Sequence, residues 1–405
     1  MPDSNNIYIL SAVRTGIGDF GGTLKDVAPA TLGKIVIEEA IRRAGVEAGE
    51  VQHVVMGQAI PSEPRDSYLA RISAVEAGVP IEAPALTVNR LCASGMQAIV
   101  SGAQLIALDE ADIVVTGGAE TMSKSPYVQT SSRWGLKMGD MKVIDAMIGV
   151  LSDPFEGYHM GITAENIATK YQVTREDQDA LAVESHRRAA KAWEEGRFDS
   201  QIVPVEIKTR KGVVEFKMDE HVRTDVSLES MAALRPAFDK EGSVTAGNAS
   251  GINDGAAALV LASGMAVKEK NLKPMARIIG WGYAGVDPSL MGIGPVKAAP
   301  AALARAGLTL DDIDVIEANE AFASQSCAVA RELGLDPEKT NPNGSGISLG
   351  HPVGASGAII TVKLVYELQR IGGRYGLATM CVGGGQGIAI VVESLQNVGA
   401  MEKAA

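Results

Sequence analysis

Residues 40–59 read AIRRAGVEAGEVQHVVMGQA and residues 302–321 read ALARAGLTLDDIDVIEANEA, with the same order of residue types. Each stretch contains the end of a helix, an Ala-Gly pair, a polar turn and an apolar strand. The two stretches are 262 residues apart, and at the same offset Ala93-Ser94-Gly95 matches Ala355-Ser356-Gly357. Segments that recur in one order at one offset indicate two similar halves of a duplicated fold.

Each half also has an alternating pattern of helices and strands. A helix of small residues is followed by an apolar strand that ends in glycines. This alternation predicts an α/β fold with a mostly parallel sheet and helices on both faces. In the first half, the first strand is predicted at 7–13, the small-residue helix at 93–108 and the glycine-ended strand at 112–120. In the second half, the corresponding elements are predicted at 276–282, 355–370 and 377–385.

Residues 121–249 interrupt this pattern, because they are richer in charge and have no counterpart in the second half. Within them, 173–198 predicts a helix with Thr174 and Asp177 in a capping arrangement, and 203–223 predicts short strands with a basic turn. We expect an inserted domain that lies over the functional site. The predicted division is 1–120 with 250–271 for the first half, 121–249 for the insertion, 272–396 for the second half and 397–405 for a tail.

The composition excludes several classes of protein. A net charge of −12 argues against a general nucleic-acid binder, which needs a basic face. Three cysteines in 405 residues are too few for a disulfide framework and favour a reducing compartment. The chain shows no signal-peptide pattern, no run of about 18 apolar residues and no metal-binding motif. We therefore expect a cytoplasmic protein without metal, membrane or nucleic-acid binding.

The first candidate for chemistry is Cys92. It follows a predicted strand at 86–90 and precedes the small-residue helix. Unpaired backbone N–H groups and the helix dipole at such a position favour a thiolate. The alternative is a buried cysteine that acts only as a small hydrophobe.

The second candidate is His351, which lies in SLGHPVGAS just before the second small-residue helix. A histidine there can accept the proton of a thiol and later stabilise an oxyanion. A hydrogen-bonded loop histidine is the alternative. The other four histidines, at 53, 159, 186 and 221, lack such surroundings.

Two further positions complete the pattern. Cys381 precedes a glycine run that includes Gly383, where backbone N–H groups can approach a ligand closely, and its thiol suits an acid or base at carbon. Asn319 follows the apolar strand 313–317, at the rim where such sheets place their sites, although an asparagine there also suits a helix cap. Cys327 lies mid-helix among small residues and is predicted to be a core residue.

One motif points to another class of enzyme. GISLG at 346–350 matches the pattern of serine hydrolases, with Ser348 as the nucleophile. That fold needs its histidine well after the serine, whereas the last histidine here is only three residues further on. A serine hydrolase therefore remains the weaker alternative.

Taken together, these residues resemble the thiolase family, the acyl-CoA acetyltransferases. The resemblance covers about 7–393. The fold that it implies has two similar halves with mixed sheets covered by helices and a loop domain inserted in the first half, usually in tetramers or dimers. The motifs that carry it are SAVRTGIGDFGG (11–22), YHMGITAEN (158–166), NASGINDGAAA (248–258), NEAF (319–322), GHPVGASG (350–357) and CVGGGQG (381–387).

The resemblance implies a role for each candidate residue. Cys92 resembles the acylated nucleophile, His351 its base, and Cys381 the acid or base at the α-carbon of the second thioester. Asn319, through a water, and His351 would form one oxyanion site, and the N–H groups of Cys92 and Gly383 the other. Coenzyme A and acyl-CoA are then substrates, with no tightly bound cofactor. The coenzyme A contacts implied are His159, Met160, Arg223 and Ser250, with Leu151, Ser230 and Phe322 as weaker candidates.

Departures from the family pattern bear on the acyl group. The segments 93–96 and 343–347 differ from those of many acetoacetyl-CoA thiolases and, with EPRD (63–66), resemble bacterial β-ketothiolases of broader chain length, which supply polyester precursors. By the same resemblance, Met291 lies near the acyl group. A non-catalytic acyl-CoA or lipid-binding member of the fold is the other alternative, and it predicts the loss of a catalytic group that this chain retains. Lys208, Arg210, Lys211 and Lys217, with Arg223, form a basic stretch that is either a solvated turn or an attraction for the coenzyme A nucleotide.

Overall fold

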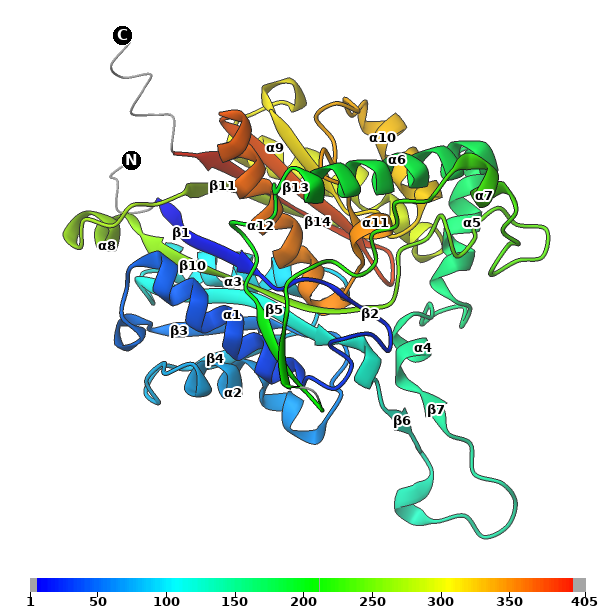
Figure 1. The fold of residues 1–405 in the computed structure, drawn as a ribbon, viewed down its shortest axis with the longest axis horizontal. Helices are drawn as coiled ribbons and strands as arrows, with labels where there is room; N and C mark the ends of the chain where they lie inside the picture. Colours follow the sequence, from blue (N-terminus) through cyan, green and yellow to red (C-terminus); the bar gives the residue numbers. More distant parts are fainter. Residues whose placement is uncertain (1–5, 211, 396–405) are drawn as a thin grey trace.

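The computed structural model describes residues 6–210 and 212–395, so the predicted tail at 397–405 lies outside the described residues. A ten-stranded sheet runs through both halves, in the order β12-β13-β14-β11-β1-β10-β5-β3-β4, with β2 paired to β10 (Figure 1). The strands are β1 Ile7–Arg14, β2 Gly18–Asp19, β3 His53–Gly57, β4 Ala85–Val88, β5 Ile113–Thr121, β10 Asn253–Ser263, β11 Ala276–Gly285, β12 Val315–Ala318, β13 Tyr375–Val382 and β14 Gln386–Ser394.

The strand order repeats itself about the centre of the sheet. On one side β1 pairs with β10, β10 with β5 and β5 with β3; on the other β11 pairs with β14, β14 with β13 and β13 with β12. In both series the first two pairings are antiparallel and the third is parallel. The α/β class and the two similar halves are therefore confirmed. The two halves meet where β1 pairs with the start of β11.

The prediction of a mostly parallel sheet is wrong. Only β3–β4, β3–β5 and β12–β13 are parallel among the strand pairs of this sheet in the described residues. The reason is the direction in which the last strand of each half, β10 or β14, joins the sheet. A tight turn at 383–385 leads β13 straight back into β14, and β10 enters between β1 and β5 antiparallel to both. The sheets are mixed, as the family resemblance implies.

Two helices, α3 (Ser94–Ala107) and α12 (Val353–Ile371), lie between the two parts of the sheet (Figure 1). One hydrophobic cluster joins side chains of both helices to β5 and β10 of the first half and to β13 and β14 of the second. Because α12 is covered on all sides, nearly all of its residues are buried. On the outer faces, α1 (Pro29–Ala44) and α2 (Leu69–Glu76) cover the first half, and α9 (Pro295–Ala306) and α10 (Ala323–Leu333) cover the second.

The repeated Ala-Ser-Gly triplets lie where α3 and α12 touch. A Cβ atom on Gly95 would lie 2.8 Å from the backbone nitrogen of Ala358, and one on Gly357 would lie 2.5 Å from the backbone nitrogen of Met96. Each half thus supplies a glycine that lets the other helix approach to backbone contact. This contact places the N-terminal ends of the two central helices side by side.

The segment between β5 and β10 contacts both halves. Its helices α5 (Met160–Lys170) and α6 (Arg175–Glu194) pack against α10, whereas its hairpin of β8 (Val205–Thr209) and β9 (Gly212–Phe216) packs on the first half. The predicted cap of α6 is confirmed, since Thr174 Oγ accepts from the N–H of Asp177 at 3.1 Å and the Asp177 carboxylate accepts from the N–H of Thr174. The remaining elements are β6 Tyr127–Val128, β7 Ile144–Asp145, α4 Ala146–Val150, α7 Leu228–Ala232, α8 Gly264–Glu269, α11 Gly346–Leu349 and 3₁₀ helices at 48–50, 64–68, 122–124, 132–134, 288–293 and 310–312.

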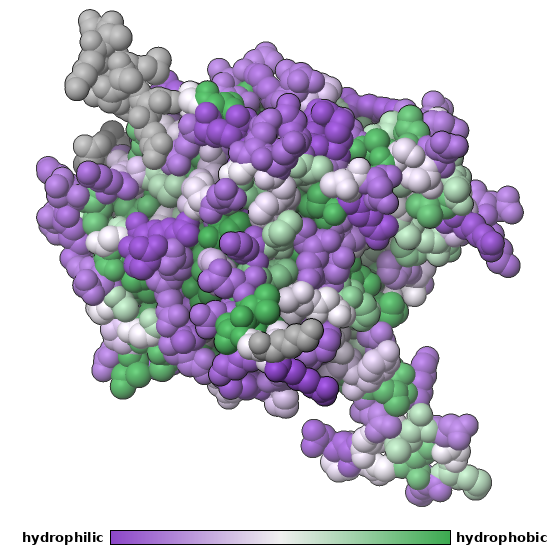
Figure 2. Space-filling model, in the orientation of Figure 1, coloured by the Kyte–Doolittle hydropathy of each residue, from purple (hydrophilic) through white to green (hydrophobic). Residues whose placement is uncertain are grey.

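An arm formed by residues 125–145 extends away from the body of the molecule and contains the short strands β6 and β7 (Figure 1). Figure 2 shows hydrophobic side chains gathered on this arm, beside a body whose visible face is largely hydrophilic. Trp134 and Met138 are each 90% exposed. Among helices of the described residues, none is long and apolar enough to cross a membrane.

Candidate active site

Cys92 lies in a strained turn between β4 and α3. The preceding residue, Leu91, has a φ of 47°, a left-handed conformation that is unfavourable for a residue with a side chain. Three hydrogen bonds from two side chains hold this turn: Asn89 Oδ1 accepts from the N–H of Leu91 at 2.9 Å, and Ser94 Oγ donates to the Leu91 carbonyl and accepts from the N–H of Arg90. The turn is therefore braced so that Cys92 precedes the first residue of the helix.

The Cys92 thiol is protonated at neutral pH. Burial raises its pKa to about 11, while the backbone N–H groups of Gly383 and of Cys92 itself act in the opposite direction and the Glu120 carboxylate adds to the rise. The expectation that the helix start favours a thiolate is thus wrong in direction, because the loss of solvent outweighs the helix N-terminus. The two N–H groups nevertheless interact with the sulfur and favour its charged form.

His351 lines the same cavity as this thiol and is neutral. It lies between α11 and α12, its backbone N–H donates to Asn253 Oδ1 at 2.9 Å, and burial lowers the pKa of its imidazole to about 4. Its Nδ1 lies 2.6 Å from Ser356 Oγ, which in turn lies 2.8 Å from the Pro352 carbonyl oxygen. Its Nε2 is buried and has no hydrogen-bond partner in the described part of the chain.

These contacts define the tautomer of His351. The Pro352 carbonyl can only accept, so the single proton of the Ser356 hydroxyl is donated to it. Ser356 Oγ must then accept from His351, which places the imidazole proton on Nδ1. Nε2 carries the free lone pair and is the atom able to take a proton from a thiol.

A cavity of about 50 Å³ brings most of the predicted residues together. Cys92, His351 and Gly383 line it together with mostly apolar side chains. The predicted coenzyme A and acyl contacts that line the same cavity are Leu151, His159, Met160, Ser250, Met291 and Phe322. His159 has a second, structural task, since its Nδ1 caps α5 by accepting from the N–H of Gly161 and its ring stacks on Phe238 at 4.6 Å.

Cys381 and Asn319 are buried beside this cavity but do not line it. Cys381, near the end of β13, packs in one cluster with Met160, Met291 and Phe322. Burial raises the pKa of its thiol far above the ordinary range, and the nearby Cys92 adds to this rise. Asn319 donates its backbone N–H to a β13 carbonyl, while its side-chain nitrogen is buried without a partner among the described residues.

Arg223 and Ser230 line a second cavity, of about 190 Å³. Ala249 lines this cavity and the next residue, Ser250, lines the catalytic one, so the two cavities adjoin through one stretch of backbone. Of the predicted basic stretch, only Arg223 lines this cavity. Lys208, Arg210 and Lys217 lie on or beside the β8–β9 hairpin, and Lys211 lies outside the described residues.

The second cavity also contains two histidines that the sequence analysis set aside. His186 lines it from α6, and its Nδ1 accepts from the backbone N–H of Arg223 at 3.2 Å. His221 also lines the cavity, and its Nδ1 lies 2.6 Å from an Asp19 oxygen. Burial, together with the neighbouring His221 and Arg223, lowers the pKa of His186 to about 4. The sequence spacing of His186 and His221 does not indicate that they lie close together, because their proximity depends on α6 packing beside the loop after β9.

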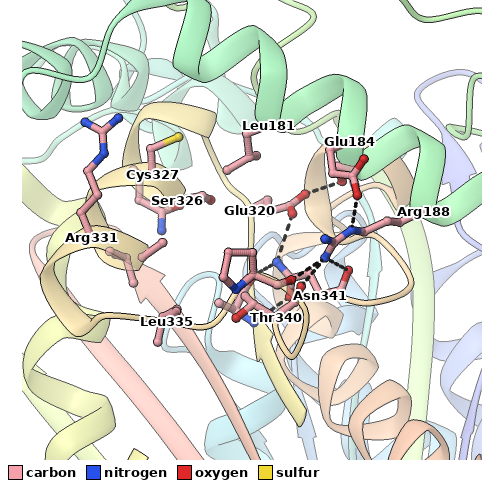
Figure 3. Close-up of a pocket in the computed structure, with 16 residues that line it drawn as sticks. Leu181, Glu184, Arg188, Glu320, Ser326, Cys327, Arg331, Leu335, Thr340 and Asn341 are labelled. Carbon is pink, nitrogen blue, oxygen red and sulfur yellow. Dashed lines mark hydrogen bonds and ion pairs between the residues drawn. The ribbon is translucent and has the colours of Figure 1, made fainter.

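A third cavity, of about 310 Å³, lies between α6 and α10 and includes neither Cys92 nor His351 (Figure 3). Cys327 lines it from the middle of α10, and burial raises the pKa of this thiol to about 12. Glu320 reaches it from the other side, held by the Ser185 hydroxyl at 2.6 Å and by Asn341 at 3.0 Å. The Ser185 hydroxyl oxygen also lies 2.8 Å from Ser348 Oγ.

The serine-hydrolase alternative is not favoured by this arrangement. Ser348 is fully buried in α11, and its hydroxyl is occupied by Ser185 and by the Ser345 carbonyl. It lines neither the catalytic cavity nor the one that holds Arg223. The described residues contain no group of three or more His, Cys, Asp and Glu that could hold a metal ion.

The family models divide the chain as its duplication does. The thiolase N-terminal domain matches residues 7–265, and the thiolase C-terminal domain matches residues 272–394. Together with a cavity that holds a cysteine from one helix start and a histidine from the other, this match shows that the chain belongs to the thiolase family of acyltransferases.

The relatives cover the whole length of the chain. It is 58% identical to the β-ketothiolase BktB of Cupriavidus necator over 97% of this chain and 100% of that protein. The crystal structure of Bacillus anthracis acetyl-CoA acetyltransferase is 50% identical, with a TM-score of 0.94 over 96% of this chain and 99% of that one. Human mitochondrial 3-ketoacyl-CoA thiolase, solved in complex with CoA, is 45% identical, with a TM-score of 0.94 over 96% and 98%.

Proposed function

We propose that this protein is a β-ketothiolase that catalyses the reversible condensation of acetyl-CoA with an acyl-CoA through an acyl-enzyme on Cys92. The observation that carries the proposal is that one cavity is lined both by the Cys92 thiol and by His351, whose buried Nε2 has no other partner among the described residues. Nearly full-length similarity to proteins named β-ketothiolase and acetyl-CoA acetyltransferase supports it.

In the first half-reaction, His351 Nε2 takes the proton of Cys92 and the thiolate attacks the acyl-CoA carbonyl. The negative oxygen of the tetrahedral intermediate accepts from the N–H groups of Cys92 and Gly383, which already converge on the sulfur. Coenzyme A then leaves as a thiolate. The acyl group remains on Cys92.

In the second half-reaction, acetyl-CoA binds and Cys381 removes a proton from its α-carbon. The raised pKa of this thiol keeps it protonated at rest, so it must first give up its proton, and the departing coenzyme A thiolate is the group able to take it. The resulting strong base suits a weak carbon acid. Asn319, whose amide nitrogen is free of other partners in the described chain and would act through a water, and protonated His351 then stabilise the enolate oxygen. The enolate carbon attacks the acyl carbonyl, the C–S bond to Cys92 breaks, and the Cys92 thiolate takes back the proton from His351 as 3-oxoacyl-CoA is released.

Coenzyme A would span the two adjoining cavities. Its nucleotide would lie near Arg223 and Ser230, and its pantetheine arm would pass Ala249 and Ser250 toward Cys92. The complex of human 3-ketoacyl-CoA thiolase with CoA supports this use of the fold. Coenzyme A and its thioesters are thus substrates and products, with no resident cofactor, and the inserted segment 121–249 supplies much of their binding.

The wall around the acyl group is apolar and adaptable. Met160 and Met291 line it together with Val150, Leu151 and Phe322. Since methionine adapts its shape, an added methylene or two can be accommodated. We infer a short-chain substrate range that includes four and five carbons, suited to the supply of polyester precursors.

The proposal extends to location and assembly. The three cysteines are free, which supports a reducing compartment such as the cytoplasm. Assembly into dimers or tetramers is supported by the apolar side chains exposed on the arm, among them Tyr127, Trp134 and Met138.

Thiolysis of 3-oxoacyl-CoA substrates of four to twelve carbons with free coenzyme A tests the function. We expect kcat/KM values for four and five carbons within roughly tenfold of each other, about 1.4 kcal/mol, and a decline for long chains. Strict four-carbon specificity or a long-chain optimum would contradict the inferred range. Absence of thiolysis at every length would contradict the function itself.

A further inference from the structure

Glu120 is a buried carboxylate that the proposed reaction does not use. It lies near the end of β5, fully buried. It accepts three backbone N–H groups, from Ala59 at 2.8 Å, from Ile60 at 3.2 Å and from Gly354 at 2.8 Å. These donors belong to the loop after β3 and to the first turn of α12, which lie far apart in the sequence.

One oxygen of Glu120 joins these two segments. Its Oε2 accepts from both Ala59 and Gly354, whereas Oε1 accepts from Ile60. A Cβ atom on Gly354 would lie 2.3 Å from this Oε2 and 2.8 Å from the Ala59 nitrogen, so only glycine permits the approach. Gly354 follows His351 by three residues and begins the helix that carries Ser356.

A second link continues from Ala59 to the nucleophile. The side-chain nitrogen of Asn89 donates to the Ala59 carbonyl at 3.0 Å. The side-chain oxygen of the same asparagine accepts from the N–H of Leu91, the left-handed residue directly before Cys92. A continuous series of hydrogen bonds therefore runs from the helix start beside His351, through Glu120, Ala59 and Asn89, to the turn of Cys92.

We propose that Glu120 is a positioning residue that, together with Asn89, sets the distance and orientation between the Cys92 thiol and His351 Nε2. The two groups come from different halves of the chain, and proton transfer between them requires hydrogen-bond geometry. The inference rests on the proposed roles of Cys92 and His351. Its physical basis is that one shared acceptor atom restrains both backbone segments at once.

Two substitutions of Glu120 test the shared acceptor. Burial raises the pKa of Glu120 to about 8, so its hydrogen bonds rather than a full charge define its role. Glu120→Gln keeps a carbonyl oxygen that can occupy the Oε2 position and accept from Ala59 and Gly354, but places an amide N–H₂ beside the N–H of Ile60. Glu120→Met has a similar volume and no acceptor. We expect thiolysis by Glu120→Gln to keep kcat within about threefold of the unsubstituted enzyme, and Glu120→Met to lose about 30-fold with KM for coenzyme A changed less than twofold.

The control is another buried carboxylate far from the site. Glu393 is 2% exposed and forms ion pairs with Arg277 and Arg374. It lies on β14 opposite Tyr375, at the other end of β13 from Cys381. We expect Glu393→Met to lower the melting temperature while kcat stays within twofold. A loss of kcat in Glu393→Met equal to that in Glu120→Met would assign the effect to general destabilisation and overturn the inference.

Asn89 provides a second route to the same test. We expect Asn89→Ala to lower kcat about tenfold and, because both residues act through Ala59, to lower it much less in a Glu120→Met background. If Glu120→Met does not fold, Asn89→Ala alone remains decisive, and an unchanged kcat would overturn the inference. Equal losses in Glu120→Gln and Glu120→Met would also overturn it, because keeping the shared acceptor would then make no difference.

The proposed function is tested separately in the same assay. If Cys92→Ser retained thiolysis, the nucleophile would be wrong and the link would have nothing to position. If Cys92→Ser were inactive and Glu120→Met fully active, the function would stand and only the inference would fail.

Discussion

The starts of α3 and α12 occupy equivalent positions in the two halves, yet they contribute opposite partners to the site. Ser94 and Ser356 correspond at the repeat offset and both brace a turn beside the cavity. Ser94 binds only backbone atoms of the Cys92 turn, whereas Ser356 binds one backbone carbonyl and the His351 ring. The first serine shapes a backbone, and the second selects a tautomer.

This difference shows how a duplicated scaffold can support asymmetric chemistry. The contact of α3 with α12 at Gly95 and Gly357 brings two similar helix starts together. Proton transfer needs a donor and an acceptor, so a pair of identical groups would be useless there. The scaffold is repeated, and the function arises from the positions where the repeat has diverged.

The largest expected effect separates the cysteines of the two halves. Cys92→Ser should lower thiolysis by about 10⁴-fold and prevent acetylation by acetyl-CoA, because the nucleophile is lost. Cys381→Ser should still acquire one acetyl group on Cys92 but condense poorly, since its role is at the α-carbon. Mass spectrometry of labelled peptides checks both. A label found on Ser348 or Cys381 would contradict the assignment, as would wild-type exchange of α-protons in Cys381→Ser.

The second prediction concerns the charge at the two helix starts. With the pKa of Cys92 raised to about 11 and that of His351 lowered to about 4, both groups are neutral at any pH between these values. Alkylation of Cys92 by iodoacetamide should therefore rise about tenfold per pH unit from pH 7 to 9, as the thiolate fraction rises. Peptide mapping distinguishes Cys92 from the other thiols. A rate that is already constant below pH 8 would instead indicate a thiolate–imidazolium pair.

The third prediction compares the two serines. Ser356→Ala leaves His351 Nδ1 without its acceptor, so part of the enzyme should adopt the wrong tautomer and kcat should fall about tenfold, with little change in KM. Ser356→Thr keeps the hydroxyl and should recover more activity than Ser356→Ala. The measurement is steady-state thiolysis. Equal activities of the two variants would show that packing, rather than the hydrogen bond, explains the loss.

The fourth prediction concerns the inserted segment, which has no counterpart in the second half. Arg223→Ala should raise KM for coenzyme A about tenfold with kcat nearly unchanged, because Arg223 lines the cavity assigned to the nucleotide. Arg210→Ala, at the exposed turn of the β8–β9 hairpin, is the matched control and should leave KM unchanged. A similar rise in both variants would indicate long-range attraction rather than contact.

The smallest effect concerns the two glycines. Gly95→Ala and Gly357→Ala should each destabilise the protein by about 1–3 kcal/mol, measured by thermal or denaturant unfolding, because the added methyl separates α3 from α12. The cost should be greater at Gly357, where the clash with backbone is closer. Gly49→Ala, which meets nothing within 4 Å, should be neutral. Equal stability of all three variants would contradict the close helix contact.

The sequence was most informative where function depends on order along the chain. The repeated offset predicted two halves, and the positions of Cys92 and His351 before matching helices predicted that they belong to one site. The cap at Thr174 was readable because its hydrogen bonds join residues within one turn. The direction of the strands could not be predicted in this way. β10 follows the long segment 121–249, and no local sequence pattern indicates whether it runs parallel or antiparallel to β1 and β5.

Electrostatics and long-range contacts also escaped prediction. A helix start suggested a thiolate at Cys92, but the pKa depends on how much solvent the surrounding chain removes. His186 and Arg223 meet because α6 packs beside a loop, and Glu120 meets Gly354 across more than half of the chain. Such pairs have no shared motif that a single sequence could reveal.

The central position of β1 has a consequence for synthesis of the chain. Both neighbours of this strand, β10 and β11, begin about 250 residues later. At a synthesis rate of roughly 5–20 residues per second, β1 leaves the ribosome on the order of ten seconds or more before either partner exists. During that interval its apolar residues and open edges must be kept from other chains, either by transient contacts with α1 or by chaperones. A strand that is almost fully buried in the folded protein is thus the one that waits longest for its neighbours.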